Sequence, residues 1–374
     1  MPIKLTPKTK RNISRIIPFG IIWLATGWVF LITEQILTRN QNFNPETDVT
    51  VTLPVFIFAS IAITILGLII GTIEMLFIEK KFRNYSLKAK MGFKFGIYLI
   101  LFLLVIVVTF PIAEGLESGL SPLNQEVMSK LGRFFISLTF VNTIFQLSVS
   151  LFASLIYSAV SENLGHNVFV SLITGRYHKP AVEKRIFMFL DMKSSTTIAE
   201  SLGHVRYFEL LREYYDLMSD PIINSYGEVY QYIGDEIVVS WKLEKGLANA
   251  LCIKCFFEIQ NQLAKTQEHF NNTYGEEVGF KAGFHLGEVT IGEIGVLKKE
   301  IVFTGDVLNT TSRIQNQCGA LQSDLLISGK LKDNLNSNEF VFESKGVIEL
   351  RGRDQREELF AVDRNNQQAS ILPI

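Results

Sequence analysis

The stretch RIFMFLDMKSST, residues 185–196, decides how the second half of the chain folds. Its first part is a short apolar run that ends in Asp191, which predicts a buried strand with a carboxylate emerging at its end. The next residues, from about 195 to 226, read as two helical segments. The turn into this helix holds Ser194, Ser195 and Thr196, and the free N–H groups and positive dipole of a helix start suit a triphosphate.

A second carboxylate lies in EVYQYIGDEIVVSW, residues 228–241. Gly234 and Asp235 stand between two β-rich runs, which is typical of a β-hairpin. If this hairpin lies beside the first strand, the carboxylates of Asp191 and Asp235 meet at one point. Paired oxygen ligands of this kind make a Mg²⁺ or Mn²⁺ site that leaves positions open for substrate phosphates. Met192, next to Asp191, is assigned to the same metal site.

Strands and helices continue to alternate after the hairpin. A long helix is expected over about 247–271, a strand pair over 278–294, and a segment over 301–318 that begins extended and becomes helical. Late strands in LLIS, FVFESKGVIEL and ELFAVD close the domain. The pattern predicts one α/β domain of ferredoxin-like type over 181–365, followed by a short tail at 366–374.

All three cysteines lie in this half and fit a reducing compartment better than a disulfide framework. Cys252 and Cys255 form a C-x-x-C within a helix that has an apolar face. The favoured interpretation is two core thiols. The alternative is a redox or metal pair, although no second cysteine pair exists to complete a zinc site.

The first half of the chain has a different composition, because four long stretches in it carry no charged residue. A hydrocarbon core of ~30 Å needs roughly 20 apolar residues as helix. The chain is therefore not wholly soluble, and an all-α four-helix transmembrane domain is expected over 16–161. The expected spans are about 16–36, 50–77, 94–113 and 134–158, surrounded by membrane lipids.

Positive charge alternates between the segments that flank these spans. The tail of residues 1–15 and the loop after the second span each hold five Lys or Arg, whereas the other two loops hold one and two. By the positive-inside rule both termini are cytoplasmic, in the inner (plasma) membrane. Residues 159–374 carry a net charge of −7, so they are a poor candidate for binding nucleic acid.

Two polar residues, Asn142 and Gln146, lie one helical turn apart in the fourth span. They could form a helix–helix hydrogen bond or contact a ligand within the bundle. Incidental polarity facing neighbouring helices is the other interpretation. The sequence therefore leaves open whether the bundle binds a lipid, a small apolar molecule or a membrane partner.

The helix of the fourth span is expected to run on as a neck over 159–180. Apolar residues recur there every four positions, at Val160, Leu164, Val168 and Leu172. Gly165 weakens this helix and Pro180 ends it. The neck is either a signalling helix that pairs with its twin in a dimer or a plain juxtamembrane helix on the bilayer.

Four motifs, in the order FLDMKSST, YIGDEIVVSW, FHLGEVTIGEIG and TGDVLNTTSR, resemble the class III nucleotidyl cyclases, the adenylate and guanylate cyclases. The resemblance covers about residues 181–363. It implies that Asp191 and Asp235 are the two metal-binding aspartates, for two Mg²⁺ or Mn²⁺ ions in each active site.

The same resemblance assigns the remaining catalytic positions. Asn309 and Arg313 match the N-x-x-x-R helix that steadies the transition state. Arg351 falls where the family usually has a lysine that contacts phosphate, and Arg for Lys keeps the charge but changes the geometry. His285 lies in a motif where the family often has H-x-G and is interpreted as structural.

The base-selecting residues depart from the family pattern. Four residues before the second metal aspartate, adenylate cyclases usually have Lys and guanylate cyclases Glu, whereas this chain has Gln231. The partner position is Val302, and Thr304 could substitute for it only if the strand shifts. Glutamine offers both a donor and an acceptor. ATP is favoured because the guanine-type Glu is missing.

The resemblance thus implies a membrane-bound adenylate cyclase that converts ATP to 3′,5′-cyclic AMP and pyrophosphate. In this family the metal residues and the Asn/Arg pair of one site come from different subunits, so a homodimer is expected, regulated through its membrane domain. Two alternatives are a guanylate or dual-specificity cyclase and a membrane receptor whose cyclase half binds nucleotide without turning it over.

Overall fold

The chain divides into two compact units, one of residues 9–170 and one of residues 171–374 together with 1–8. The computed structural model describes residues 5–38, 46–78, 87–349 and 356–365. Arg351 and the predicted tail 366–374 lie outside the described residues.

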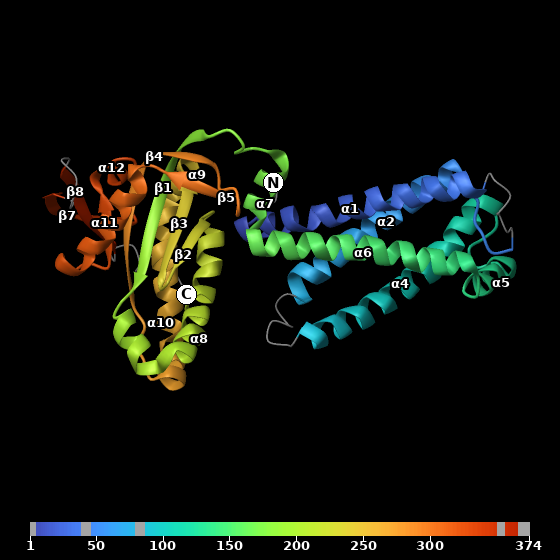
Figure 1. Cartoon of the computed structure of the whole chain (residues 1–374), viewed down its shortest axis with the longest axis horizontal. Coiled ribbons are helices and arrows are strands. Elements are labelled where there is room, and N and C mark those ends of the chain that lie inside the picture. Colours follow the sequence, from blue (N-terminus) through green and yellow to red (C-terminus); the bar gives the residue numbers. More distant parts are fainter. Residues whose placement is uncertain (1–4, 39–45, 79–86, 350–355, 366–374) are drawn as a thin grey trace. The chain divides into compact units, whose positions relative to one another are not determined.

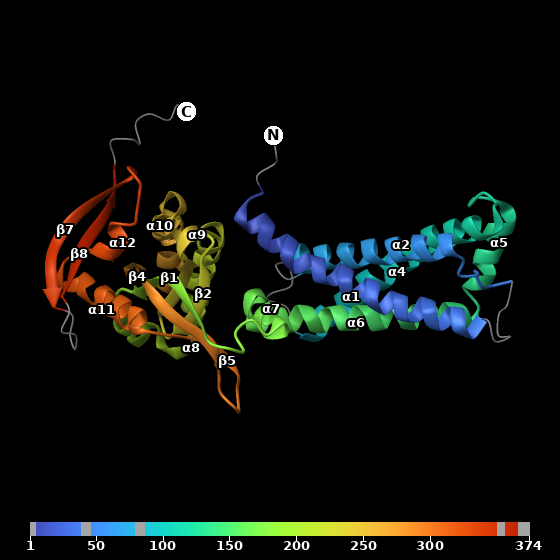
Figure 2. The same ribbon diagram turned by 90° about the horizontal axis from the view of Figure 1, so that it is seen from above.

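The first unit is helical, and its long helices run side by side (Figures 1 and 2). Its elements are α1 (Pro7–Thr38), α2 (Leu53–Ile73), the π-helical turn η1 (Glu74–Ile78), α4 (Leu87–Ser118), α5 (Gln125–Phe134) and α6 (Leu138–Leu164). Four helical segments are long and apolar enough to cross a membrane, in agreement with the four expected spans: Pro7–Ile36, Leu53–Ile78, Gly92–Ser118 and Leu138–Leu164.

The start of the fourth span differs from the prediction. Phe134 belongs to the short helix α5, and α6 begins only at Leu138. The reason is a helix cap, because the Ser137 hydroxyl accepts a hydrogen bond from the Phe140 N–H at 3.2 Å. A serine at this position ends one helix and starts another.

Buried polar contacts tie the long helices together. The Trp23 indole N–H donates to the Ser154 hydroxyl at 2.8 Å, between α1 and α6. Glu74 forms an ion pair with Lys94 and accepts a hydrogen bond from the Tyr98 hydroxyl at 2.6 Å. Polar groups within membrane helices are favourable when they pair in this way.

The expected unbroken helix from the fourth span to Pro180 is wrong. The helix α6 ends at Leu164, and Gly165 takes φ +82° and ψ 133°, outside the helical region. A second short helix, α7, spans His166–Thr174 and ends well before Pro180. The apolar four-residue repeat is therefore shared between two helices.

The second unit is a mixed sheet with helices. Its elements are β1 (Ala181–Met192), α8 (Ser195–Asn224), β2 (Glu228–Ile233), β3 (Glu236–Lys242), α9 (Leu243–Leu247), η2 (Ala248–Ala250), α10 (Leu251–Tyr274), β4 (Phe280–Ile294), β5 (Glu300–Thr304), α11 (Asp306–Ala320), β6 (Leu325–Ser328), α12 (Gly329–Lys332), β7 (Phe340–Glu349) and β8 (Arg356–Arg364). The strand order is β2-β3-β1-β4-β6-β8-β7, and β5 pairs with β4. The hairpin of β7 and β8 forms one edge of the sheet (Figure 2).

The first four strands confirm the ferredoxin-like prediction. The chain runs β1-α8-β2-β3-α10-β4, and these strands lie in the order β4-β1-β3-β2 with antiparallel neighbours. The strand pair expected over 278–294 is wrong, because β4 is one strand of 15 residues. It pairs with β1 without interruption from Phe280 to Ile291, so its glycines form no turn.

The two faces of the sheet carry different helices. On one face, Ile186, Met188 and Leu190 of β1 pack in a core with α8 and α10. Cys252 and Cys255 lie in this core, fully buried, and burial raises the pKa of each thiol to about 12. They are core thiols. On the other face, alternate residues of β1 pack with residues of α11.

Candidate active site

The sheet register brings the two predicted aspartates together. Because β1 and β3 are antiparallel and Leu190 pairs with Ile237, the end of β1 lies beside the turn that begins β3. Gly234 in that turn has φ +64°, a conformation that glycine adopts without strain. The carboxyl groups of Asp191 and Asp235 lie within hydrogen-bonding reach of each other.

The site is crowded with negative charge. Burial and the neighbouring Asp235 raise the pKa of Asp191, and the Lys281 ammonium, 3.5 Å from Asp191 Oδ2, partly opposes this. Burial and the charges of both aspartates raise the pKa of Glu236 to about 7. One oxygen of Asp235, Oδ2, is buried and accepts no hydrogen bond. A divalent cation would satisfy this oxygen and relieve the repulsion, so the residues fit a metal.

The described part of the chain holds no cluster of three or more His, Cys, Asp or Glu side chains arranged for a metal. A metal would therefore be held by Asp191 and Asp235, with its remaining positions filled from elsewhere. The Met192 side chain is only 2% exposed and belongs to the hydrophobic core. Only the backbone carbonyl of Met192 could therefore serve the metal site.

The turn after β1 has the geometry of a helix start. Ser194 takes the left-handed conformation with φ +55°, and α8 begins at Ser195. The first backbone N–H groups of a helix have no partner within the helix. Ser194 and Thr196 are exposed, so an anion can reach this end of α8. Tyr207 lies near Ser195, and the charges of both aspartates raise its pKa, so the turn lies near the carboxylates.

Two residues that the sequence analysis missed hold the aspartates in place. The Gln315 amide on α11 donates to Asp191 Oδ2 at 3.1 Å. The Tyr215 hydroxyl on α8 donates to the Gly234 carbonyl at 2.7 Å. Neither contact has a signal in the sequence, because each joins segments that only the folded sheet brings together.

A close approach between α11 and β4 makes the Gln315 contact possible. A Cβ atom placed on Gly283 would lie 2.3 Å from the Gln315 backbone nitrogen. Glycine at this position therefore lets the helix lie directly on the strand. The inner face of α11 is buried, and its buried residues are Val307, Thr310, Thr311, Ile314, Gln315 and Cys318.

Asn309 and Arg313 lie on the opposite, outward face of α11. Asn309 is exposed and Arg313 is half-buried. Among the residues that the structure describes, no hydrogen bond or ion pair joins either of them to Asp191 or Asp235. The structure thus brings the two aspartates together but leaves the Asn/Arg pair facing away from them.

Comparison with known proteins decides the family. Residues 178–363 match the family model for the adenylate and guanylate cyclase catalytic domain. These residues form a class III cyclase domain. The match agrees with the resemblance of the four motifs and with the paired carboxylates.

Two curated relatives of the cyclase domain come from Rhizobium meliloti (strain 1021). "Adenylate cyclase 2" is 39% identical over 198 residues, which is 53% of this chain and 54% of the relative. "Adenylate cyclase 1" is 26% identical over 188 residues, 47% of this chain and 27% of the relative. The chain thus spans about half or less of the length of these relatives. A solved bacterial light-regulated adenylyl cyclase has a similar fold, with a TM-score of 0.52, 20% identity and coverage of 61% of this chain and 66% of that one.

The strands that carry the residues expected to select the base, β2 and β5, are in contact. Gln231 is exposed on β2, next to a bulge after Val229. Val302 and Thr304 lie on β5. The rings of Tyr230 and Phe303 join these strands, with centroids 4.8 Å apart, and the Phe303 N–H donates to the Tyr230 hydroxyl at 3.3 Å.

His285 has the structural environment that the sequence predicted. Its side chain is 4% exposed, and its Nδ1 lies 2.8 Å from the Ser328 hydroxyl, between β4 and β6. A buried histidine held in this way fixes the contact between two strands of the cyclase domain.

Proposed function

We propose that the protein is a membrane-bound adenylate cyclase that converts ATP to 3′,5′-cyclic AMP and pyrophosphate. The observation that carries the proposal is the pair of adjacent carboxylates, Asp191 and Asp235, with one buried oxygen left unsatisfied. The 39% identity to a protein named as an adenylate cyclase supports ATP as the substrate.

The reaction joins the ribose 3′-oxygen to the α-phosphorus and breaks the bond from that phosphorus to pyrophosphate. Two Mg²⁺ or Mn²⁺ ions held by Asp191 and Asp235 would supply charge that lowers the hydroxyl's pKa and holds the departing phosphates. The N-terminus of α8, with Ser194, Ser195 and Thr196, binds the triphosphate. Gln315 keeps the Asp191 carboxylate oriented.

Stabilising the transition state also needs positive charge near the α-phosphate and a group that positions the ribose. Arg313 meets the negative charge that grows on the α-phosphate, and Asn309 orients the ribose. Arg351 contacts phosphate. Because Asn309 and Arg313 face away from the aspartates of their own chain, we infer that a second copy supplies them and that the active enzyme is a homodimer with two equivalent sites.

The residues of the site specify the base of the nucleotide less clearly than they specify its phosphates and ribose. Gln231 could pair with adenine or guanine, since its amide both donates and accepts. A guanylate or dual-specificity cyclase is therefore the second candidate function. Replacing Gln231 with Lys should favour ATP and replacing it with Glu should favour GTP. No change in either variant would show that Gln231 does not select the base.

The helical unit anchors the enzyme and, we propose, regulates it. The distribution of Lys and Arg supports a topology with both termini in the cytoplasm and the protein in the inner (plasma) membrane. Only Gly165 separates α6 from α7, the helix nearest the cyclase domain in sequence. Inserting two residues after Gly165 should change cyclase activity. Unchanged activity would mean that this segment is only a tether.

The test of the proposed function is direct. The purified full chain in detergent, given ATP and Mn²⁺, should produce cyclic AMP, and Asp191→Ala and Asp235→Ala should each abolish production while leaving the protein folded. A parallel assay with GTP separates the two cyclase candidates. A folded wild-type chain that binds nucleotide but yields no product with either would favour the receptor alternative.

A further inference from the structure

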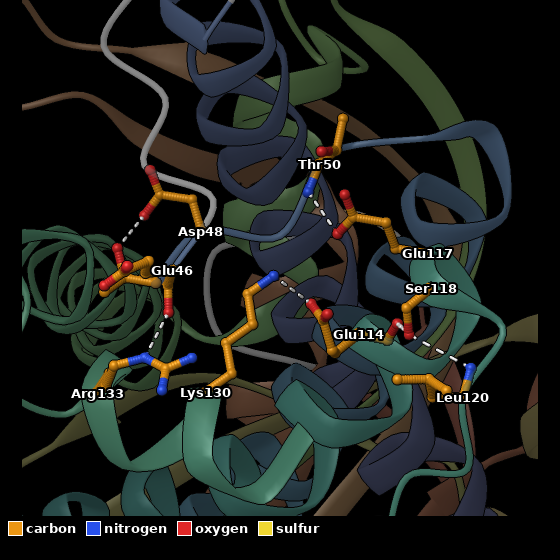
Figure 3. A network of polar contacts seen from close by, with 10 residues as sticks. Glu46, Asp48, Thr50, Glu114, Glu117, Ser118, Leu120, Lys130 and Arg133 are labelled. Carbon is orange, nitrogen blue, oxygen red and sulfur yellow. Dashed lines mark hydrogen bonds and ion pairs between the residues drawn. The ribbon is translucent and has the colours of Figure 1, made fainter. Parts of the chain in front are cut away.

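Buried charged side chains form networks in both units of the chain. In the helical unit, Lys130 forms an ion pair of 2.6 Å with Glu114, and Arg133 donates to the Glu46 carbonyl at 3.2 Å (Figure 3). These contacts tie α5 to α4 and to the segment before α2. In the cyclase domain, a second network surrounds Arg185, which is only 2% exposed. This second network reaches the strands that carry residues expected to select the base.

The Arg185 side chain contacts residues of β1, β2, β3 and β5. It donates to Glu183 of its own strand β1 at 3.0 Å and to Glu228 of β2 at 2.9 Å. It also donates to the Ser240 hydroxyl of β3 at 3.0 Å, and its guanidinium carbon lies 4.8 Å from the centre of the Phe303 ring on β5. A guanidinium is planar and carries five donors in a fixed fork, so one arginine can hold several partners in a single arrangement.

Backbone pairing alone holds β2 and β5 weakly. The strand β2 ends the strand order and is bulged: Val229 pairs with Val239 and Gln231 pairs with Val238, so Tyr230 has no partner in the ladder. A bulge changes the direction of the side chains beside it. The strand β5 has five residues and pairs with β4. The position of Gln231 therefore depends on side-chain contacts as well as on the ladder.

The unpaired Tyr230 makes such a contact with Phe303. The ring centroids lie 4.8 Å apart, and the Phe303 N–H donates to the Tyr230 hydroxyl at 3.3 Å. Tyr230 precedes Gln231 on β2, and Phe303 stands between Val302 and Thr304 on β5. The contact between the two rings is thus one residue away from each position that is expected to select the base.

The segment that enters the cyclase domain is fastened to the same network. Tyr177, between α7 and β1, is only 7% exposed and belongs to the hydrophobic cluster against which Phe303 packs. Its hydroxyl donates to Glu183 at 3.1 Å, and its carbonyl accepts a hydrogen bond from the Glu293 N–H at 3.2 Å. Glu183 therefore links Tyr177 to Arg185.

We propose that Arg185 is a positioning residue for the base of the nucleotide. The inference rests on the proposed function, because it concerns the base of the same substrate. Through Glu228 and Phe303, the buried guanidinium holds β2 and β5 at one separation. Gln231 and Val302 on these strands are then placed to contact the base. Arg185 acts through the two strands and does not itself touch the nucleotide.

The triphosphate end of the substrate is held by other groups. In the proposed function these are the metal ions at Asp191 and Asp235 and the N-terminus of α8. Asp191 lies six residues beyond Arg185 on β1, ~20 Å away at the rise of an extended strand. A disturbance of the network should therefore weaken binding of the base and leave binding of the phosphates unchanged. Tyr177 gives the segment 175–180 the same selective effect.

The test uses the full chain in detergent, isothermal titration calorimetry and two probes, each with Mn²⁺. The nucleotide probe is 2′,3′-dideoxy-ATP, which has no 3′-hydroxyl and so cannot cyclise. The second probe, inorganic tripolyphosphate, has no base. Arg185→Lys keeps the charge but loses the planar fork. It should weaken dideoxy-ATP binding about tenfold, the effect of losing roughly one hydrogen bond, and leave tripolyphosphate binding unchanged.

A milder variant tests the link to the entering segment. Tyr177→Phe removes only the hydroxyl that contacts Glu183, and it should weaken dideoxy-ATP binding about threefold. The double variant should bind dideoxy-ATP about as weakly as Arg185→Lys alone, because both changes act through the same contacts.

Two matched controls should bind both probes like the wild type. Arg364→Lys changes another arginine that lies over a phenylalanine ring, 5.0 Å from the centre of Phe257. Tyr226→Phe removes the hydroxyl of a half-buried tyrosine. Thermal unfolding of each variant checks that the cyclase domain is folded.

Three results would overturn the proposal. Equal weakening of both probes by Arg185→Lys would mean that the residue supports the whole site and not the base. Unchanged dideoxy-ATP binding in Tyr177→Phe and in a folded Arg185→Lys would mean that the network does not reach the base. A wild-type chain that binds dideoxy-ATP no more tightly than tripolyphosphate would mean that the base is not held. These binding measurements need no turnover, so a failure here is distinguishable from a failure to form cyclic AMP.

Discussion

The Gln315 side chain on α11 donates a hydrogen bond of 3.1 Å to the Asp191 carboxylate at the end of β1. The same helix carries Asn309 and Arg313 on its other face. One helix therefore supports the Asp191 carboxylate of its own chain, which we propose binds metal, and presents the Asn/Arg pair outward. In the proposed dimer, α11 thus serves two active sites at once.

Replacing Gln315 with Ala should reduce cyclase activity about tenfold and raise the Mn²⁺ concentration needed for half-maximal activity. The Asp191 carboxylate loses a hydrogen-bond donor and is no longer held in one orientation. Gln260→Ala, at an exposed position on α10, is the matched control and should leave both values unchanged. If Gln315→Ala lowers activity without changing the metal dependence, the contact does not act through the metal site.

Tyr215→Phe should destabilise the turn that carries Asp235. The hydroxyl donates to the Gly234 carbonyl at 2.7 Å, and losing one such hydrogen bond typically costs about 1 kcal/mol of unfolding free energy. Urea unfolding measures the change. Ser219→Ala removes an exposed hydroxyl from the same helix and should have a smaller effect. Equal losses in the two variants would mean that the Tyr215 contact contributes nothing specific.

Gly283→Ala should destabilise the cyclase domain by roughly 1–3 kcal/mol, because the new Cβ would lie 2.3 Å from the backbone of α11. The helix would have to move, and the Gln315 contact should weaken with it. Gly319→Ala, where a Cβ meets nothing within 4 Å, should be neutral or stabilising. Thermal unfolding of both variants gives the comparison, and a neutral Gly283→Ala would contradict the close packing.

A buried ion-pair cluster predicts an acid-sensitive domain. Arg185, only 2% exposed, contacts Glu183 at 3.0 Å and Glu228 at 2.9 Å. Burial alone would raise the pKa of Glu183, but the hydrogen bond and charge of Arg185 outweigh burial and lower it below the ordinary 4.5. The unfolded state therefore binds the proton more readily, so this stabilisation is present above pH 4.5 and is lost as the pH falls through the lowered value.

Glu183→Gln tests this pH dependence. The variant should be less stable than the wild type at neutral pH, and the difference should shrink as the pH falls below about 4.5. Chemical unfolding at several pH values measures it, with the exposed Glu244→Gln as the control. A difference that stays constant from pH 7 to pH 3 would show that the charge of Glu183 does not stabilise the fold.

Local patterns in the sequence were sufficient for much of the fold. The run ending at Asp191 and the Gly-Asp turn predict β1 and the hairpin, and the antiparallel register then brings their carboxylates together. Span length and charge predict the four long helices. These features depend on periodicity and turn chemistry, which act over short stretches of chain.

The predictions that were wrong, and the residues that were missed, have other physical causes. Gly165 breaks a helix whose apolar repeat continues through it, and β4 continues through glycines that suggested a turn. At Gly165 the break is local, because glycine readily takes the positive φ that ends a helix, whereas in β4 the uninterrupted pairing with β1 outweighs the turn preference of glycine. Gln315 and Tyr215 could not be found because their partners are distant in sequence. Asn309 and Arg313 were assigned only through the resemblance to the cyclases, since the function proposed for them depends on a second chain.

The most direct test of a site shared between two subunits is complementation in mixed dimers. Asp191→Ala and Arg313→Ala chains, each inactive alone, are co-expressed with different affinity tags and the heterodimer is isolated through both. One of its two sites then has every residue intact, so it should recover about half of the wild-type rate of cyclic AMP formation. A heterodimer no more active than the two single variants would contradict the shared site.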